Sequence, residues 1–258
     1  TTQKIIYDQM NHSLQIMKDS VTSPIRSPKK SIGGLIGGEA QLVNQHRLSG
    51  NSICGPVLSK AISYSMAVLE TNTTMGLIVA APTAGSSGVI PGLLLALQEE
   101  YHLEDNEIIN ALFNASAIGY LAMRNATVAG AVGGCQAEVG VASAMASSAA
   151  VELMGGTPDQ CLHAATSVLM NFLGLVCDPI GGLVECPCQG RNAAGVAVAL
   201  TAAELSLSGI KQLIPFDEML QTMYQVGRQI PPGLRETALG GCAATPAGKK
   251  LGCKICPK

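Results

Sequence analysis

The chain has 258 residues, a net charge of −2 at pH 7 and only 13% charged residues, which excludes the clustered positive surface of a nucleic-acid-binding protein. Its length allows one large hydrophobic core or two small ones. Aromatic residues make up 3% and tryptophan is absent, so small side chains fill the interior and predict closely packed helices.

The first 30 residues predict a helical arm. Ile5, Ile6, Met10, Leu14 and Met17 recur at helical spacing, and the prolines at 24 and 28 end the pattern. A glycine-rich loop is expected at 31–38.

The remaining elements are also predicted to be helical. No alternation typical of strands is present, so the fold class is all-α: a compact, small-residue-rich helical domain with candidate metal ligands on the loops that flank helices. The domains expected are an arm at 1–30, a helical catalytic domain at 31–230 and a tail at 231–258. The helices expected within the domain are 56–75, 105–120, 138–154, 158–173, 191–208 and 216–230.

An uncharged window at 71–98 raises the question of a membrane span. Pro82, Pro91 and several glycines interrupt this window, which favours a broken segment buried in protein. No signal peptide opens the chain, and nine cysteines without one indicate a reducing compartment. We therefore expect a soluble cytoplasmic protein.

Three cysteines lie in segments of glycine, small and polar residues where predicted helices break: Cys135, Cys177 and Cys188. Three thiolates without a fourth cysteine in a similar segment suggest a metal centre with one open position, as in a catalytic site. The absence of a suitably placed histidine fits an iron–sulfur cluster better than zinc. Each cysteine taken singly could equally be a small buried hydrophobic residue.

Other cysteines leave alternatives open. Cys186 lies two residues before Cys188, so either could be the ligand. Cys253 and Cys256 form a C-x-x-C pair without a second pair, which favours an incidental tail over a zinc or redox site. Cys54 and Cys161 are expected in the core.

The segment 82–88 combines hydroxyl groups with free backbone N–H groups at the entry to a helix, and such a loop can bind a carboxylate. A helix break satisfied by its own hydroxyl groups is an equally good interpretation.

Several motifs together carry a family resemblance. In order along the chain they are 81–91 (APTAGSSGVIP), 134–140 (GCQAEVG), 173–184 (LGLVCDPIGGLV), 187–192 (PCQGRN) and 234–241 (LRETALGG). Together they resemble the alpha chain of bacterial iron–sulfur-dependent L-serine dehydratases, and the likeness covers most of the chain.

The resemblance implies a [4Fe–4S] cluster on Cys135, Cys177 and Cys188, and it selects Cys188 over Cys186. In single-chain members of that family a C-terminal cysteine reaches the site. The tail departs from the family pattern through Cys242 and the pair Cys253 and Cys256, so the role of these cysteines stays open.

The resemblance also implies an incomplete enzyme. The segment that supplies a proposed histidine base in the family is absent, so the identity of the base is open and we expect a beta chain as partner, in an oligomeric assembly. The expected reaction is deamination of L-serine to pyruvate and ammonia, a step in amino-acid degradation and gluconeogenesis.

In this reaction the open iron would act as a Lewis acid on the substrate hydroxyl group. Residues Thr83, Gly85, Ser86, Ser87 and Gly88 are expected to bind the substrate, with Arg191 or Arg124 facing its carboxylate. The residues expected to orient the ligands are Gln136, Glu138, Asp178 and Asn192. For the charged residues of the site, a buried structural ion pair is an equally good interpretation. The alternatives are a cysteine desulfidase-like lyase and a non-catalytic iron–sulfur electron carrier.

Overall fold

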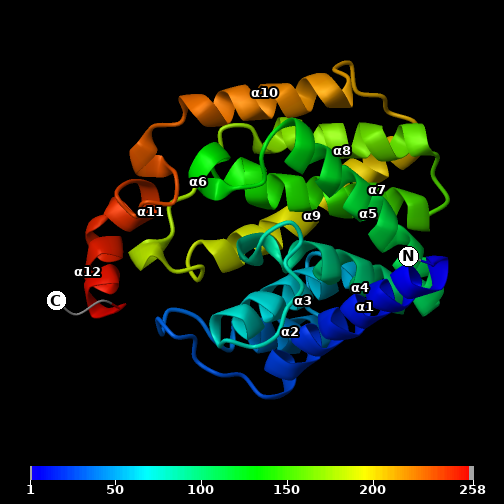
Figure 1. The fold of residues 1–258 in the computed structure, drawn as a ribbon. Helices are drawn as coiled ribbons and strands as arrows, with labels where there is room; N and C mark the ends of the chain where they lie inside the picture. The colour runs from blue at the N-terminus through cyan, green and yellow to red at the C-terminus, as the bar shows by residue number, and fades with distance from the viewer. Residues whose placement is uncertain (1, 256–258) are drawn as a thin grey trace.

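The computed structural model describes residues 2–255, and within them the regular elements are helices joined by loops, which confirms the all-α prediction (Figure 1). The β-type pairing found within these residues is one isolated parallel bridge between Cys177 and Arg235. The α-helices are α1 (Gln3–Arg26), α2 (Glu39–Leu48), α3 (Gly55–Thr73), α4 (Val89–Tyr101), α5 (Asp105–Asn125), α6 (Gly130–Gly133), α7 (Val141–Leu153), α8 (Pro158–Phe172), α9 (Cys188–Leu207), α10 (Phe216–Gln229), α11 (Gly241–Ala244) and α12 (Pro246–Ile255).

Local signals placed several helices well. The Thr157 hydroxyl accepts the N–H of Gln160 and the Gln160 side chain accepts the N–H of Thr157, so the predicted capping box starts α8. The sequence interpretation did not identify α2, it expected a helix after the loop at 82–88 without giving the bounds of α4, and it treated as a plain tail the region that holds α11 and α12.

Helix α7 occupies the centre of the molecule and packs against α4, α5, α8 and α9. Every residue from 141 to 151 is buried, and most of them are Ala, Ser or Val. These small side chains allow close contact: a Cβ atom added at Gly195 of α9 would lie 2.7 Å from the Ser143 Oγ of α7.

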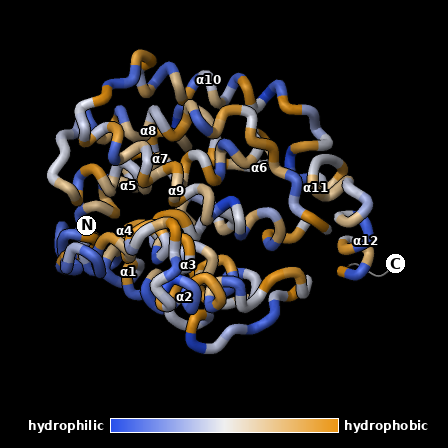
Figure 2. Tube along the Cα trace, turned by 180° about the vertical axis from the view of Figure 1, so that it is seen from behind, coloured by the Kyte–Doolittle hydropathy of each residue, from blue (hydrophilic) through white to orange (hydrophobic). Residues whose placement is uncertain are grey.

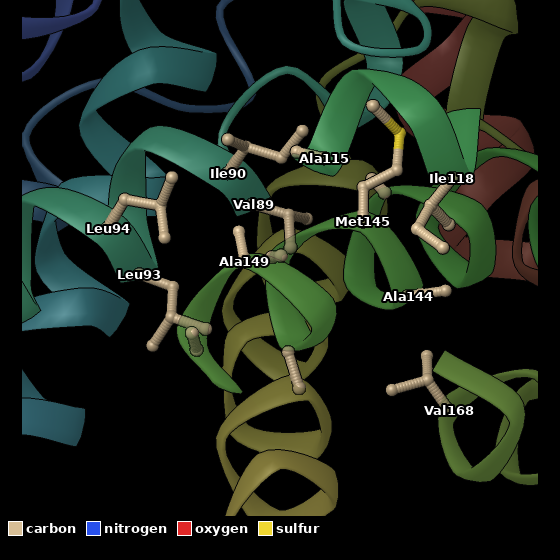
Figure 3. Packing of buried hydrophobic residues seen from close by; sticks show 14 of the residues in the cluster. Val89, Ile90, Leu93, Leu94, Ala115, Ile118, Ala144, Met145, Ala149 and Val168 are labelled. Carbon is tan, nitrogen blue, oxygen red and sulfur yellow. The ribbon is translucent and has the colours of Figure 1, made fainter. Parts of the chain in front are cut away.

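Larger side chains of the neighbouring helices fill the space around α7. Figure 3 shows Val89, Ile90, Leu93 and Leu94 of α4 on one side and Ile118 of α5 near Met145 of α7. The small-residue helix and its large-residue neighbours therefore form one continuous core.

The outer helices are amphipathic. Along α10 hydrophilic and hydrophobic residues alternate (Figure 2), and its buried face carries Phe216, Met219, Leu220 and Met223. Helix α1 likewise buries Leu14, Met17 and Val21 against the body.

The tail lies at one end of the molecule. Helices α11 and α12 lie at the end that also carries α6, far from the N-terminus of α1 (Figure 1). Helix α12 packs on the short 3₁₀ turn η3 (Ile180–Gly182), just after Cys177. Within residues 2–255 none of the helices has the length and apolar character needed to cross a bilayer.

Candidate functional site

The three predicted ligand cysteines are buried at the ends of helices. Cys135 directly precedes the π-helical turn η2 (Gln136–Gly140), which continues into α7. Cys177 follows α8 and forms the parallel bridge with Arg235. Cys188 is the first residue of α9 and not part of the loop before it. Their exposed fractions are 3%, 4% and 8%, respectively.

A glycine and a glutamine shape the segment around Cys135. Gly134 has φ +74°, a left-handed conformation that glycine adopts without strain, and it links α6 to Cys135. The Gln136 side chain is buried: its Nε2 donates to the Met223 carbonyl at 2.8 Å, and its Oε1 accepts the Gly174 N–H at 2.9 Å. The Gln136 N–H donates to the Leu175 carbonyl at 3.1 Å. Gln136 therefore holds the Cys135 segment beside the chain that leads to Cys177.

The three thiols influence one another electrostatically. Burial raises the pKa of Cys135 to about 11 and that of Cys188 to about 12. Burial also raises the pKa of Cys177, and the charges of Glu138, Cys135 and Cys188 raise it further. The thiols are therefore close neighbours that stay protonated at neutral pH unless a cation compensates their charge.

Cys186 is a poorer member of this group. It is half-buried, and after burial its pKa responds to Arg191, Asp178 and Glu185, none of which is a cysteine. The pKa of Cys188, in contrast, is raised by the charge of Cys135. Cys188 is therefore the more deeply buried of the two, and its pKa is raised by Cys135 and, less strongly, by Cys186.

Glu138 connects the cysteines to the loop at 83–88. Its Oε1 accepts the Thr83 hydroxyl at 2.8 Å, and its Oε2 lies 3.6 Å from Cys177 Sγ. Burial raises the pKa of Glu138, the Thr83 hydroxyl opposes this shift, and the charge of Glu236 adds to it. A carboxylate, a hydroxyl group and a thiol thus converge from three distant parts of the chain.

The polar groups of the loop at 83–88 are hydrogen-bonded within the protein. Thr83 precedes the 3₁₀ turn η1 (Ala84–Ser86), and its hydroxyl lies 3.1 Å from that of Ser86. The Ser87 hydroxyl donates to the Ala84 carbonyl at 2.8 Å. The Gly88 N–H donates to Asn192 Oδ1 at 3.0 Å.

Asn192 fastens this loop to α9. Its Nδ2 donates to the Gly85 carbonyl at 2.8 Å and to the Cys188 carbonyl at 2.9 Å. Since Asn192 lies one turn after Cys188, the loop and the third cysteine are held in one unit.

Arg191 is held by protein groups on several sides. Its guanidinium pairs with Asp178 at 2.7 Å and donates to the Val176 carbonyl at 2.9 Å, and its charge lowers the pKa of Cys135 against the effect of burial. Asp178 also accepts the Cys242 N–H at 2.6 Å. Although burial opposes it, these donors keep the pKa of Asp178 below its usual value. The sequence did not show that Asp178 would bind the tail.

Buried Glu185 was not singled out from the sequence. It accepts the Ser31 hydroxyl at 2.7 Å, the Gly33 N–H at 2.7 Å and the Leu35 N–H at 3.0 Å. The glycine-rich segment 31–38 is thus a loop that wraps a carboxylate three residues before Cys188. The one signal in the sequence was an acidic residue among cysteines and prolines.

Among residues 2–255, no three His, Cys, Asp or Glu side chains are arranged to bind a single metal ion. A cubane cluster places each thiolate on a different iron, so its ligands stand farther apart than those of one ion. The residues that could hold such a group are the three buried thiols. Cys242 is half-buried, Cys253 is exposed and Cys256 lies outside the described residues. Cys161 is buried as expected, but Cys54 is exposed, so the prediction that it lies in the core is wrong.

The sequence model of the family described as "Serine dehydratase alpha chain" matches residues 1–243. The chain is 46% identical over 254 residues to the probable L-serine dehydratase alpha chain of Bacillus subtilis, covering 98% of this chain and 84% of that one. It is 44% identical to the L-serine dehydratase alpha chain of Peptoniphilus asaccharolyticus, with 97% and 86% covered. With L-serine dehydratase TdcG of Escherichia coli it shares 35% identity over 85% of its own length but only 48% of that protein.

Proposed function

Because the chain belongs to the serine dehydratase alpha chain family, we propose that it is the cluster-binding half of an L-serine dehydratase that converts L-serine to pyruvate and ammonia. The observation that carries this proposal is the grouping of three buried thiols beside the Thr83–Glu138 pair. Three cysteines without a suitably placed histidine in the sequence suit a [4Fe–4S] cluster better than zinc.

In this proposal Cys135, Cys177 and Cys188 hold the cluster. When bound, a cluster with three protein ligands supplies a Lewis acid for the substrate hydroxyl group at its remaining iron. The Arg191 guanidinium lies close to Cys135 and favours its thiolate form. Gln136, Asp178 and Asn192 keep the three ligand segments in register through the bonds described above.

The loop residues divide into two roles. Thr83 bonds to Glu138, Gly85 lies beside it and the Ser86 hydroxyl lies 3.1 Å from that of Thr83; these three residues are proposed to contact the substrate. Ser87 and Gly88 use their polar groups within the protein and are proposed to hold the loop in place. The Thr83 hydroxyl orients the Glu138 carboxylate next to Cys177, where the substrate would lie.

The reaction removes the α-proton and the hydroxyl group of serine, and the resulting aminoacrylate tautomerises and hydrolyses to pyruvate and ammonia. A general base must take the α-proton. We propose that a partner beta chain supplies this base, because the relatives of similar length are named alpha chains and the chain spans about half of the E. coli relative. The assembly is proposed to be cytoplasmic, where free thiols persist.

The test is anaerobic purification of this chain together with its partner chain. We expect about four irons per chain, a brown colour and pyruvate formation from L-serine. Cys135→Ser, Cys177→Ser and Cys188→Ser should each lose iron and turnover. Cys161→Ser is the matched control, because Cys161 is buried beside Asn114, away from the three thiols.

Three results would contradict the proposal. Colourless protein with one tightly bound zinc would reject the cluster. Faster turnover of L-cysteine than of L-serine would favour the desulfidase-like lyase. A cluster that persists in all three serine variants would show that other residues hold it.

A further inference from the structure

Resting on the proposed function, we propose that Arg235 binds the carboxylate group of the amino-acid substrate. The proposal depends on the position of Arg235, on the buried Nε of its guanidinium that has no acceptor, and on the conformation of the neighbouring backbone.

The parallel bridge fixes Arg235 beside Cys177. The Cys177 N–H donates to the Leu234 carbonyl at 2.9 Å, and the Glu236 N–H donates to the Cys177 carbonyl at 2.7 Å. These two bonds set the register between the tail and the ligand segment, so that Arg235 and Cys177 are paired residues. A residue 58 positions away along the chain is thereby held next to a proposed cluster ligand.

The guanidinium of Arg235 has few partners. Its Nε is buried and has no hydrogen-bond acceptor within the part of the chain that the structure describes. Its Nη1 makes one long bond, 3.5 Å, to the Val132 carbonyl of α6. A buried donor without an acceptor is costly, so the Nε–H lacks a partner such as an anion, and the half-buried side chain leaves the outer N–H donors accessible to the same anion.

Helix α6 places this guanidinium near the reacting groups. Gly130, the first residue of α6, is in contact with the site: a Cβ added there would lie 3.1 Å from Cys177 Sγ and 2.5 Å from Glu138 Oε2. Arg235 therefore approaches the same short helix that lines the Cys177–Glu138 pair.

The backbone after Arg235 is strained. Glu236 has φ +65° and Ala238 has φ +55°, left-handed conformations that are uncommon for residues other than glycine. Strain of this kind persists where the surrounding structure enforces it and is frequent at binding sites.

The chemistry of the group fits the ligand. A guanidinium forms two parallel hydrogen bonds to a carboxylate, which fixes both its position and its orientation. Arg191 is less suited to this role because Asp178 and the Val176 carbonyl already occupy it. Arg124 is exposed at the end of α5.

The experiment compares L-serine with L-serinamide, which replaces the carboxylate by a neutral amide. The protein is the anaerobic complex with its partner chain, as wild type, Arg235→Gln and Arg235→Lys. The matched control is Arg228→Gln, which removes the same charge from α10. The Arg228 guanidinium lies over the Tyr224 ring, 5.9 Å from its centre, and is not part of the proposed site. Iron content is measured for every variant, and L-serinamide is measured as substrate or as competitive inhibitor.

Loss of a hydrogen-bonded charge pair should lower kcat/KM for L-serine by about 10- to 100-fold in Arg235→Gln. The change should appear mainly in KM, with iron content and the kinetic or inhibition constants for L-serinamide unchanged. The preference for L-serine over L-serinamide should therefore fall by the same factor. Arg235→Lys should recover only part of the preference for L-serine, because a lysine cannot form two parallel hydrogen bonds to a carboxylate.

An equal loss on both substrates, or an unchanged preference, would overturn the role of Arg235. If Arg235→Gln loses iron, the test uses Arg235→Lys instead: a reduced preference for L-serine over L-serinamide supports the role of Arg235, and an unchanged preference overturns it. A wild-type complex that does not deaminate L-serine would contradict the proposed function itself, whereas an active wild type with an unchanged preference in the variants would contradict Arg235 alone.

Discussion

At the scale of single residues, the site depends on positions that only one residue type can occupy. Gly134 is the clearest case, because its φ of +74° is combined with close neighbours. A Cβ added there would lie 2.7 Å from the Leu175 carbonyl oxygen and 2.8 Å from Ile230 Cδ1. Neither a strained backbone nor a displaced carbonyl is compatible with the Gln136–Leu175 bond next to Cys135.

We expect Gly134→Ala to lower the free energy of unfolding by about 2–4 kcal/mol, from strain and overpacking together. Urea unfolding followed by circular dichroism measures the change. Gly50→Ala is the control, because Gly50 has φ +79° but nothing within 4 Å of an added Cβ, so it carries strain alone. Equal losses in the two variants would show that contact with Leu175 and Ile230 is unimportant.

The Thr83 hydroxyl is the second residue-scale test. Thr83→Val keeps the shape of the side chain and removes the bond to Glu138. We expect kcat/KM for L-serine to fall by about 5- to 100-fold with iron content unchanged, because the Glu138 carboxylate loses a direct partner.

Thr22→Val is the matched control, since its hydroxyl bonds only to carbonyls of its own helix. Unchanged kinetics in Thr83→Val would argue against a role for the Thr83–Glu138 pair.

At the scale of elements, polar side chains join helices whose apolar faces already pack together. Asp105, the first residue of α5, accepts from Lys18 of α1 and from Gln98 of α4, the latter at 2.7 Å. The bond from Lys18 lowers the pKa of Asp105 although burial opposes it. The carboxylate therefore stabilises the junction of three helices in its charged form.

A lowered pKa fixes the sign of the pH dependence. The contribution of Asp105 is complete above the pKa of the unfolded chain, near 3.8, and is lost as pH falls through the lower folded value. Because both partners are partly exposed, we expect Asp105→Asn to cost only about 0.5–1 kcal/mol at pH 7.

The difference between wild type and Asp105→Asn should shrink as the solution is acidified below pH 4. Urea unfolding at several pH values measures it. Lys4 offers a control, since Lys4→Gln on the exposed start of α1 removes a charge that makes no ion pair among residues 2–255. A difference that grows on acidification would contradict the assignment.

At the scale of the whole molecule, the tail closes over the segment that carries Cys177. The bridge to Arg235, the Cys242 N–H on Asp178 and the packing of α12 on η3 join residues 231–255 to that segment. Gly241 has φ +58°, and an added Cβ would collide with the Asp178 carboxylate. A glycine at this position allows the tail to dock.

We expect Gly241→Ala to loosen the tail by about 1–2 kcal/mol and to speed tryptic cleavage after Lys249 and Lys250 about 5- to 30-fold. Mass spectrometry of timed digests measures the rate. Gly233→Ala serves as control, because its nearest neighbour, Leu239 Cβ, would lie 3.9 Å from the added atom. Cleavage at the wild-type rate would show that Asp178 does not hold the tail.

Local sequence determined the helices and the candidate ligands. Helical spacing placed α3, α5, α8 and α10 to within a few residues, apart from the end of α5, because burial of one face follows from the order of side chains along the chain. The three cysteines were selected by their glycine-rich surroundings and by resemblance. The structure adds that they are buried neighbours, while the cluster they are proposed to bind stays a prediction.

Tertiary structure alone decided which side chains meet. Glu138 meets Thr83, Glu185 holds the loop at 31–35, Asp178 binds the tail, and Arg235 pairs with Cys177. These partners lie more than 50 positions apart, and no periodicity along the chain encodes such pairs. They form only when the small residues of α7 let the surrounding helices close around it, which is a property of the packed core and not of any one segment.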